Sequence, residues 1–258
     1  MAEIIKERVQ AQFGASAAAY AVSDVHARGE SLAVLLAEVH PAPAWELLDV
    51  ATGAGHTALA FAPRVRRAVA LDLTAPMLET SARLAAERGL TNVEVRAGDA
   101  EALPFPDASF DLVTCRLAFH HFPRPGRAML ELARVLRPGG TLGFTDNVVV
   151  VEPAAATHYN TFERLRDPSH HEVLSLTSLV DLVESVGLVV DVVRRLTKEF
   201  EFHEWADRQH VAAADKDRLL AMARTLPSAL VPLLAPRWAN GTMFFTLWEA
   251  VLVARKPA

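Results

Sequence analysis

Three aspartates lie at the ends of short apolar runs in the first half of the chain: Asp49, Asp72 and Asp99. Shortly after Asp49 comes ATGAGH (51–56), a turn of small residues that contains two glycines. If the apolar runs are parallel strands, this turn leaves backbone N–H groups free at the carboxyl edge of the sheet, where open α/β sheets bind ligands. The arrangement predicts a binding site for a small cofactor.

The type of cofactor depends on Asp49. Residues 53–58 (GAGHTA) satisfy the G-x-G-x-x-A form of the dinucleotide fingerprint, and Asp72 follows where a ribose-binding acid is expected, so an NAD-dependent oxidoreductase stays open. A carboxylate just before Gly53 would repel a pyrophosphate but attract a ligand with an ammonium and a sulfonium. The alternative is that Asp49 only caps backbone N–H groups of the turn.

Composition excludes several classes of protein. The 258 residues are 51% hydrophobic and 22% charged, which is typical of a globular protein. A net charge of -5 argues against a non-specific nucleic-acid binder. No apolar stretch is long enough to span a membrane, and the N-terminal MAEIIKERVQ does not resemble a signal peptide. The one cysteine, Cys115, cannot form an intrachain disulfide, and we expect a cytoplasmic protein.

Strands and helices alternate as in a series of βαβ units. The expected strands are at 47–50, 67–71, 93–95, 110–115, 141–145, 188–193 and 243–253. A helix over 128–137 is expected to end at Pro138-Gly139-Gly140, and Ser178 with Asp181 resembles a capping box. We expect one domain, 1–258, whose parts are a helical leader of two segments joined near Ser23 (1–39), a core (45–147), and helical insertions that cap the substrate (148–175 and 199–240).

Four motifs occur in a characteristic order: LDVATGAG, ALD, AGDAEALPFPDASFD and ARVLRPGG. Together they resemble the class I S-adenosylmethionine-dependent methyltransferases over residues 45–146. The most similar subgroup is methyltransferase type 11, which includes the ubiquinone/menaquinone C-methyltransferases. The resemblance implies a Rossmann-like α/β fold with a seven-stranded sheet, the last strand antiparallel, and helical lid insertions. It also implies S-adenosyl-L-methionine as cofactor, lying across the first four strands, and S-adenosylhomocysteine as product.

The resemblance also implies which residues hold the cofactor. Asp49 and the turn would hold the methionine part, and Asp72 would accept the two ribose hydroxyls. Asp99 would accept the adenine amine. The other implied residues are Tyr20 of the leader, Ala51, Thr52, Gly53, Gly55 and His56 of the turn, Leu73 and Met77, Gly98 and Ala100, and the backbone carbonyl of Arg116. Ala51 replaces the usual first glycine, which is tolerated if its φ stays negative.

Methyl transfer from a sulfonium is an in-line displacement in which alignment can supply ~7–11 kcal/mol of the barrier. His120 and His121 in LAFHHF are the candidate general bases, with His120 slightly favoured, although either can be structural. No metal is expected. Asp146-Asn147 resembles part of a catechol-type metal site, but Arg116 and Leu117 stand where that site needs an acid, and neighbours such as His170 and His171 point apart.

The predicted acceptor is a small aromatic or hydrophobic molecule, methylated at carbon or oxygen. This rests on aromatic residues that either line the acceptor pocket or form lid core: Phe13, Tyr20, Phe162, Phe200, Phe202, Trp205 and Trp238. No N/D-P-P-Y/F tetrapeptide supports methylation of nucleic acid, and a homodimer is compatible with the sequence. A cofactor sensor or non-methyl chemistry such as cyclisation stays open, because the motifs describe only the cofactor half.

Overall fold

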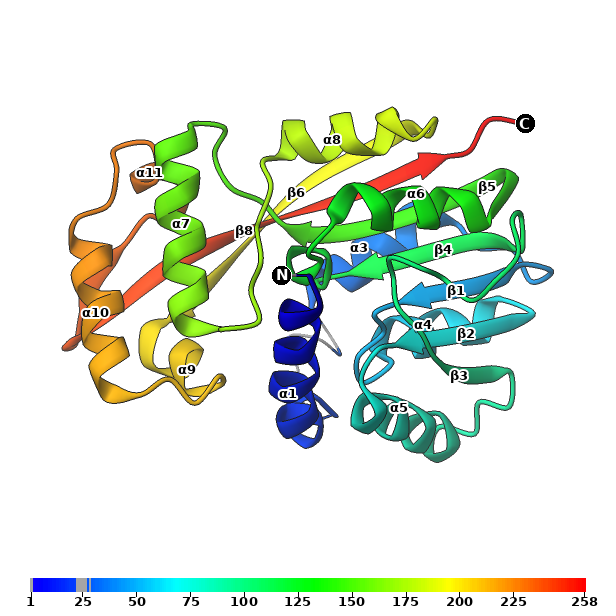
Figure 1. Cartoon of the computed structure of the whole chain (residues 1–258), viewed down its shortest axis with the longest axis horizontal. Helices are drawn as coiled ribbons and strands as arrows, with labels where there is room; N and C mark the ends of the chain where they lie inside the picture. The colour runs from blue at the N-terminus through cyan, green and yellow to red at the C-terminus, as the bar shows by residue number, and fades with distance from the viewer. Residues whose placement is uncertain (1, 22–26, 28) are drawn as a thin grey trace.

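The chain folds around one mixed sheet with the strand order β3-β2-β1-β4-β5-β8-β6, and a short strand, β7, also pairs with β8. The computed structural model describes residues 2–21, 27 and 29–258 (Figure 1). The strands are β1 (Glu46–Val50), β2 (Arg67–Asp72), β3 (Val93–Ala97), β4 (Phe110–Arg116), β5 (Leu136–Asn147), β6 (Val189–Glu201), β7 (Arg237–Ala239) and β8 (Thr242–Arg255).

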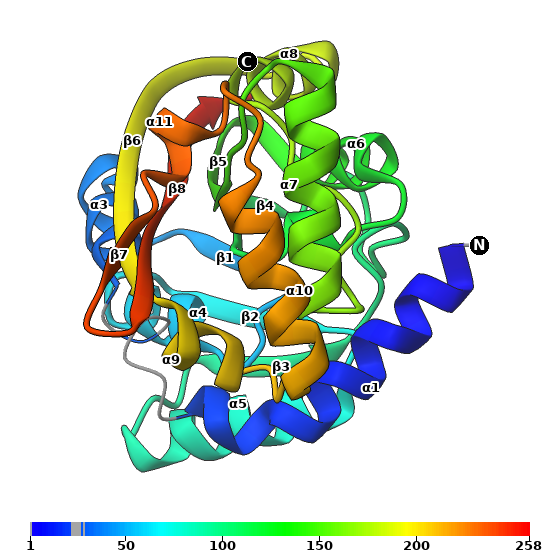
Figure 2. The ribbon, with the colours of Figure 1, turned by 90° about the vertical axis from the view of Figure 1, so that its left-hand side faces the viewer.

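Helices cover both faces of the sheet and one end of it (Figure 1, Figure 2). They are α1 (Ala2–Ala21), α3 (Glu30–Val39), α4 (His56–Phe61), α5 (Ala75–Glu87), α6 (Pro125–Val135), α7 (Pro153–Arg166), α8 (Leu176–Ser185), α9 (Phe202–Asp207), α10 (Ala213–Arg224) and α11 (Val231–Leu234). A short 3-10 helix, Phe119–His121, follows β4 and carries both candidate histidines.

The pairing of the strands confirms the predicted α/β fold. β1 pairs in parallel with β2 and β4, β2 pairs in parallel with β3, and β4 pairs in parallel with β5. β8 is antiparallel to both β5 and β6, as the resemblance implied for the last strand. The parallel strands therefore end at one edge, and the residues after β1, β2 and β4 meet there.

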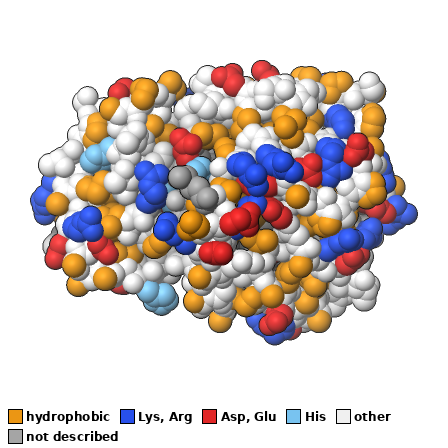
Figure 3. All heavy atoms as spheres, viewed as in Figure 1, with side chains coloured by type: hydrophobic (Ala, Val, Ile, Leu, Met, Phe, Trp, Pro, Cys, Tyr) orange, Lys and Arg blue, Asp and Glu red, His pale blue; other side chains and the backbone are white. Residues whose placement is uncertain are grey.

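The face seen in Figure 3 carries charges of both signs. Acidic, basic and hydrophobic side chains are interspersed there, and neither sign covers the face alone. Neighbouring charges also pair across elements of the fold, as in Arg67 with Glu94 and Arg134 with Asp107. In the part of the chain that the structure describes, no helix combines the length and apolar character that crossing a membrane requires.

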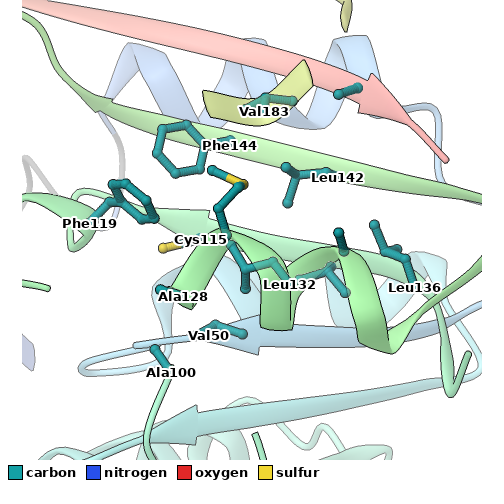
Figure 4. Close-up of a cluster of buried hydrophobic side chains, with 14 of the residues drawn as sticks. Val50, Ala100, Cys115, Phe119, Ala128, Leu132, Leu136, Leu142, Phe144 and Val183 are labelled. Atoms are coloured by element: carbon teal, nitrogen blue, oxygen red, sulfur yellow. The ribbon is translucent and has the colours of Figure 1, made fainter. Parts of the chain in front are cut away.

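The first strand shows why both sheet faces are covered. Leu47 lies in a cluster with Leu35 of α3, whereas Leu48 and Val50 lie in a cluster with Leu132 of α6. Figure 4 shows this second cluster between α6 and the sheet. Alternate residues of a strand point to opposite faces, and each fully buried leucine contributes roughly 1.5–3 kcal/mol. Packing of α3 on one face and α6 on the other thus fixes the position of β1, from which the glycine-containing turn begins.

A second hydrophobic cluster forms the cap. β6 and β8 continue past the parallel strands, and α7, α9 and α10 gather over these extensions (Figure 1, Figure 2). The rings of Phe162 and Trp205 stack with centroids 5.2 Å apart, and Phe245 of β8 meets Trp205 edge-on at 5.0 Å. Segments 148–175 and 199–240 therefore share one core with the start of the last strand.

Several predicted boundaries are wrong. β6 is longer than the expected 188–193 and includes residues 199–201, which were expected to be helical. It pairs with β8 along its length. Its charged residues face solvent on one side, so the second half of the strand lacks the continuous apolar run by which a strand is recognised in the sequence. β7 was not predicted.

Two helix ends also differ from the sequence-based expectation. Helix α6 ends at Val135, and Pro138-Gly139-Gly140 lies inside β5. Proline disfavours helical backbone at the residue that precedes it, so the helix does not continue to Pro138 as expected. Helix α8 starts earlier than expected, with Ser175 as its N-cap accepting from the Ser178 N–H. The predicted join near Ser23 lies outside the described residues.

Candidate active site

A cavity of about 410 Å³ lies at the carboxyl ends of β1, β2 and β4, between α1 and the cap. Its lining contains every residue predicted to bind cofactor or to catalyse, except Asp49 and Gly55: Tyr20, Ala51, Thr52, Gly53, His56, Asp72, Leu73, Met77, Gly98, Asp99, Ala100, Arg116, His120 and His121. Residues that are far apart in the sequence are therefore brought to one place by the ends of neighbouring strands.

The turn after β1 has an unusual backbone. Ala51 has φ 53°, Gly53 has φ 54° and Gly55 has φ 87°. The expectation that Ala51 keeps a negative φ is therefore wrong, and its side chain is strained in the left-handed region. A Cβ on Gly55 would lie 2.2 Å from Ser81 Oγ, so this glycine is needed where α4 approaches α5 rather than at the cavity wall.

Asp49 lies behind the turn instead of facing the cavity. Its carboxylate accepts hydrogen bonds from Thr52 Oγ1 at 2.5 Å, Thr114 Oγ1 at 2.7 Å and the Ala58 N–H at 3.1 Å. Burial raises its pKa to about 6. The structure therefore supports the alternative reading in which this aspartate holds the turn and the first residues of α4. The predicted direct contact with a cationic ligand has no support in this geometry.

Asp72 and Asp99 do line the cavity. Asp72 accepts the Gly53 N–H at 2.8 Å through one oxygen and the Thr74 N–H at 2.9 Å through the other. The Leu73 N–H and the Thr74 hydroxyl act on this carboxylate as well, so a ligand at Asp72 shares it with donors of the protein. Asp99 accepts the Glu101 N–H at 2.9 Å, and its other oxygen binds Lys6 Nζ at 2.6 Å.

Lys6 was not identified from the sequence. It reaches from α1 to bind Asp99 and also Glu101, whose carboxylate lies 2.8 Å from its Nζ. Burial alone would lower the pKa of Lys6, but its hydrogen bonds to Asp99 and Glu101 outweigh burial and raise it. The leader is thus attached by charge to the strand end that carries Asp99. A lone lysine in a helix gives no sequence signal of such a contact.

The cavity wall between Asp72 and Asp99 is apolar and tightly packed. Leu73, Met77 and Ala100 line it, and Met77 is 1% exposed. A Cβ on Gly98 would lie 2.7 Å from Leu71 Cδ1 and 3.1 Å from Pro104 Cδ, so a larger residue there would require the buried Leu71 side chain to shift. A flat, partly apolar group fits between these walls.

His56, Tyr20 and Arg116 close the cavity opposite this wall. His56 Nε2 donates to the Tyr20 carbonyl at 2.9 Å, which ties the end of α1 to the turn. Burial lowers the pKa of His56, so it is neutral near pH 7. Arg116 is 9% exposed, and its Nε donates to Thr57 Oγ1 at 3.0 Å.

His120 is held by Asp146. Its Nδ1 lies 2.6 Å from Asp146 Oδ1, and the same carboxylate accepts the His120 backbone N–H at 2.9 Å. Because an ionised carboxylate only accepts, Nδ1 carries the proton, and Nε2 is left as the basic nitrogen. Burial alone would lower the pKa of His120, but the charge and hydrogen bond of Asp146, together with the charges of Glu163 and Asp167, outweigh burial and raise the pKa.

His121 has the opposite electrostatics. Its Nδ1 donates to the Ser169 carbonyl at 3.1 Å, and its ring meets Phe13 edge-on at 4.9 Å. Burial, followed by the nearby His120 charge, lowers its pKa to about 4. The two candidate histidines are therefore a carboxylate-supported base and a neutral neighbour.

Only part of the predicted aromatic lining faces the cavity. Phe13, Tyr20, Phe200 and Trp205 line it, whereas Phe162 and Phe202 are buried in the cap cluster and Trp238 is exposed elsewhere. Arg166 and Arg208 line the same region, and neither was among the residues predicted for the site. Within the described residues, no three histidine, cysteine, aspartate or glutamate side chains are grouped to hold a metal ion.

Comparisons with known proteins identify relatives of the whole core. Residues 48–144 match the model of the methyltransferase domain family. YcgJ of Bacillus subtilis, described as an uncharacterized methyltransferase, is 36% identical over 196 residues, which are 76% of this chain and 78% of the relative. The demethylmenaquinone methyltransferase of Thermus thermophilus is 46% identical over 98 residues, which are 37% of this chain and 44% of that protein.

Solved structures extend the similarity beyond the core. The crystal structure of the Bacillus subtilis YcgJ protein has a TM-score of 0.85 at 30% identity and covers 88% of this chain and 98% of that chain. A structure from Bacillus halodurans C-125 gives 0.84 at 36% identity, with 88% and 99% covered. The cyclase SpnF gives 0.60 at 21% identity, with 88% and 80% covered, a likeness of fold alone.

Proposed function

The chain belongs to the methyltransferase family, in the class that depends on S-adenosylmethionine, and from this membership we propose that it methylates a small organic acceptor that gives up a proton. S-adenosylhomocysteine is then the second product. One observation carries the proposal: a single cavity is lined by Asp72 and Asp99 at strand ends and by His120, which is hydrogen-bonded to the buried Asp146. A cofactor site and a proton acceptor therefore share one enclosed space.

The residues at the strand ends fit the cofactor. Asp72 lines the cavity and would accept the two ribose hydroxyls, and Leu73 and Met77 would cover the adenine. The backbone of the Ala51–Gly55 turn would hold the methionine part. When bound, the cofactor supplies a methyl group on a sulfonium, which is activated for in-line displacement.

The protein's own contribution is alignment and removal of a proton. Side chains of α1 and the cap enclose the cavity and keep water from the acceptor. His120 would take a proton from an acceptor hydroxyl or acidic carbon, since its Nε2 is the nitrogen not bound to Asp146. This chemistry favours O- or C-methylation. We propose no metal in the step, because Arg116 stands where a catechol-type metal site needs an acid.

A second candidate function is non-methyl chemistry with the same cofactor, or a cofactor sensor. It is favoured by the shared fold of the cyclase SpnF. The carboxylate-supported His120 argues for a reaction that moves a proton, which a sensor does not need.

The experiment is to incubate the protein and S-adenosylmethionine with phenols, quinols and amines and to detect the gain of one methyl group by mass spectrometry. The variant His120→Gln should then turn over roughly 10²–10⁴ times more slowly with unchanged affinity for S-adenosylhomocysteine. The control is His203→Gln, an exposed histidine outside the cavity, which should behave as wild type. Equal loss of turnover and cofactor affinity in His120→Gln would reject the proposed role.

A further inference from the structure

Two arginines lie side by side where the cap meets the cavity. Arg166 ends α7, Arg208 follows α9, and both line the cavity. The Arg166 guanidinium is 4.4 Å from the centroid of Trp205, and that of Arg208 is 4.9 Å from the centroid of Phe200. Stacking on a ring fixes the plane of a guanidinium. Arg166 Nε donates to the Trp205 carbonyl at 3.3 Å, which leaves its terminal N–H groups for other partners.

The positive charge of this pair is only partly balanced by the protein. Arg166 has one carboxylate within ion-pair distance, Glu163 at 3.6 Å, while the charge of Asp167 acts on Arg166 and that of Glu204 on Arg208 from farther away. Within the described part of the chain, no carboxylate lies within ion-pair distance of the Arg208 guanidinium. Other acids in this part of the cavity have partners of their own: Asp207 with Lys216, Glu249 with Lys198, and Asp167 with Ser169.

The two guanidinium groups also repel each other. Burial, and next the charge of Arg166, lower the pKa of Arg208. Cations are favoured near helix C-termini, which accounts for each arginine separately. It does not account for two of them facing one partly enclosed space, where like charges cost free energy. A bound anion between them would remove that cost.

We propose that Arg166 and Arg208 bind an anionic group, a carboxylate or phosphate, on the methyl acceptor and so select which molecules are methylated. This rests on the proposed function. Guanidinium groups pair with these anions through two parallel hydrogen bonds. Phe13 and Phe200, which line the same cavity, supply apolar cover for the rest of the acceptor. The acceptor is thus an amphipathic organic anion rather than a purely hydrophobic molecule.

The test uses matched probes on the full chain saturated with S-adenosylhomocysteine. The pairs are 4-hydroxybenzoate with 4-hydroxybenzamide, 3-phenylpropanoate with its amide, and phenyl phosphate with phenol, each titrated by calorimetry. In at least one pair the anion should bind tenfold or more tightly than its neutral partner. Arg208→Gln should abolish that difference. The control Arg224→Gln should keep it, because Arg224 stacks on Trp238 at 3.7 Å but does not line the cavity.

Three results would overturn the proposal: no preference for the anion in any pair, no binding of any anion, or a preference that survives in Arg208→Gln. Affinity for S-adenosylhomocysteine is measured first in every variant and should not change. Failure of wild type to bind S-adenosylhomocysteine would reject the proposed function. Normal cofactor binding without anion preference would reject only the role of the arginines.

Discussion

The hydrogen bond between His120 and Asp146 carries most of the chemistry expected of this site. The carboxylate fixes which ring nitrogen is protonated, and it raises the pKa of His120 above the ordinary 6.5. Because the charged form is stabilised in the fold, this pair stabilises the protein below pH 6.5, and that contribution is lost as pH rises through the raised pKa. The neutral form needed for catalysis appears over the same range.

We therefore expect the rate of wild type to rise with pH through a pKa above 6.5. In Asp146→Asn the pKa of His120 should fall, because burial then acts without the compensating charge, and the rising limb should move to lower pH. The plateau rate should drop as well, since the ring loses its orientation. The measurement is kcat against pH in both proteins. A purely structural Asp146 would lower the plateau without moving the limb.

Ala51 stores strain at the start of the turn. Its φ of 53° costs an L-residue about 1–2 kcal/mol, which glycine does not incur. The greater freedom of glycine in the unfolded chain offsets part of this gain. Ala51→Gly should therefore stabilise the fold by a net ~0.5–1 kcal/mol, measured by urea unfolding. Ala54→Gly is the control, since Ala54 is 2% exposed and has no positive φ, and it should destabilise. A destabilised Ala51→Gly would contradict the strain.

At the scale of elements, α1 packs against α5 and is also fastened over the cavity by polar contacts near its two ends. Lys6 joins it to Asp99 and Glu101, and His56 holds its far end at the Tyr20 carbonyl. Phe13 packs on the His121 ring between these two points. The charged and polar contacts at the ends of α1 therefore add to its packing against α5 in holding it over the cavity.

Removal of the Lys6 charge should loosen this helix. Lys6→Met loses two charge-assisted hydrogen bonds, each worth about 1.5–3 kcal/mol, so amide hydrogen exchange in α1 should quicken by roughly tenfold or more. S-adenosylhomocysteine should dissociate faster. Arg8→Met removes the same charge from an exposed position on the same helix and should leave exchange unchanged. Equal exchange in the two variants would show that Lys6 does not fasten α1.

At the scale of the whole molecule, the sequence predicts the parallel core well. The strands after Trp45 are apolar on both faces, so their runs are continuous, and the turn and acids follow each run at the same edge. The extended end of β6 could not be recognised, because one side faces solvent and carries charge. Its existence depends on pairing with β8, which lies far away in the sequence.

The residues of the candidate site likewise include some that could be predicted from the sequence and some that could not. Asp72 and the histidines follow strands directly, so their convergence was predictable from topology. The orientation of Asp49 could not be predicted, because an aspartate before a turn has the same sequence pattern whether it faces a ligand or accepts hydrogen bonds from the backbone. Lys6, Arg166 and Arg208 reach the cavity from helices whose positions depend on tertiary packing, and they were not among the predicted site residues.

The central claim is that this cavity binds an adenosyl cofactor at Asp72. The most direct measurement is calorimetric titration of S-adenosylhomocysteine and, separately, NADH into wild type, Asp72→Asn and the exposed control Asp217→Asn. We predict that wild type and Asp217→Asn bind S-adenosylhomocysteine equally, that Asp72→Asn binds it about tenfold or more weakly, and that NADH does not bind. Tight binding of NADH, or an Asp72→Asn variant with wild-type affinity for S-adenosylhomocysteine, would contradict the claim.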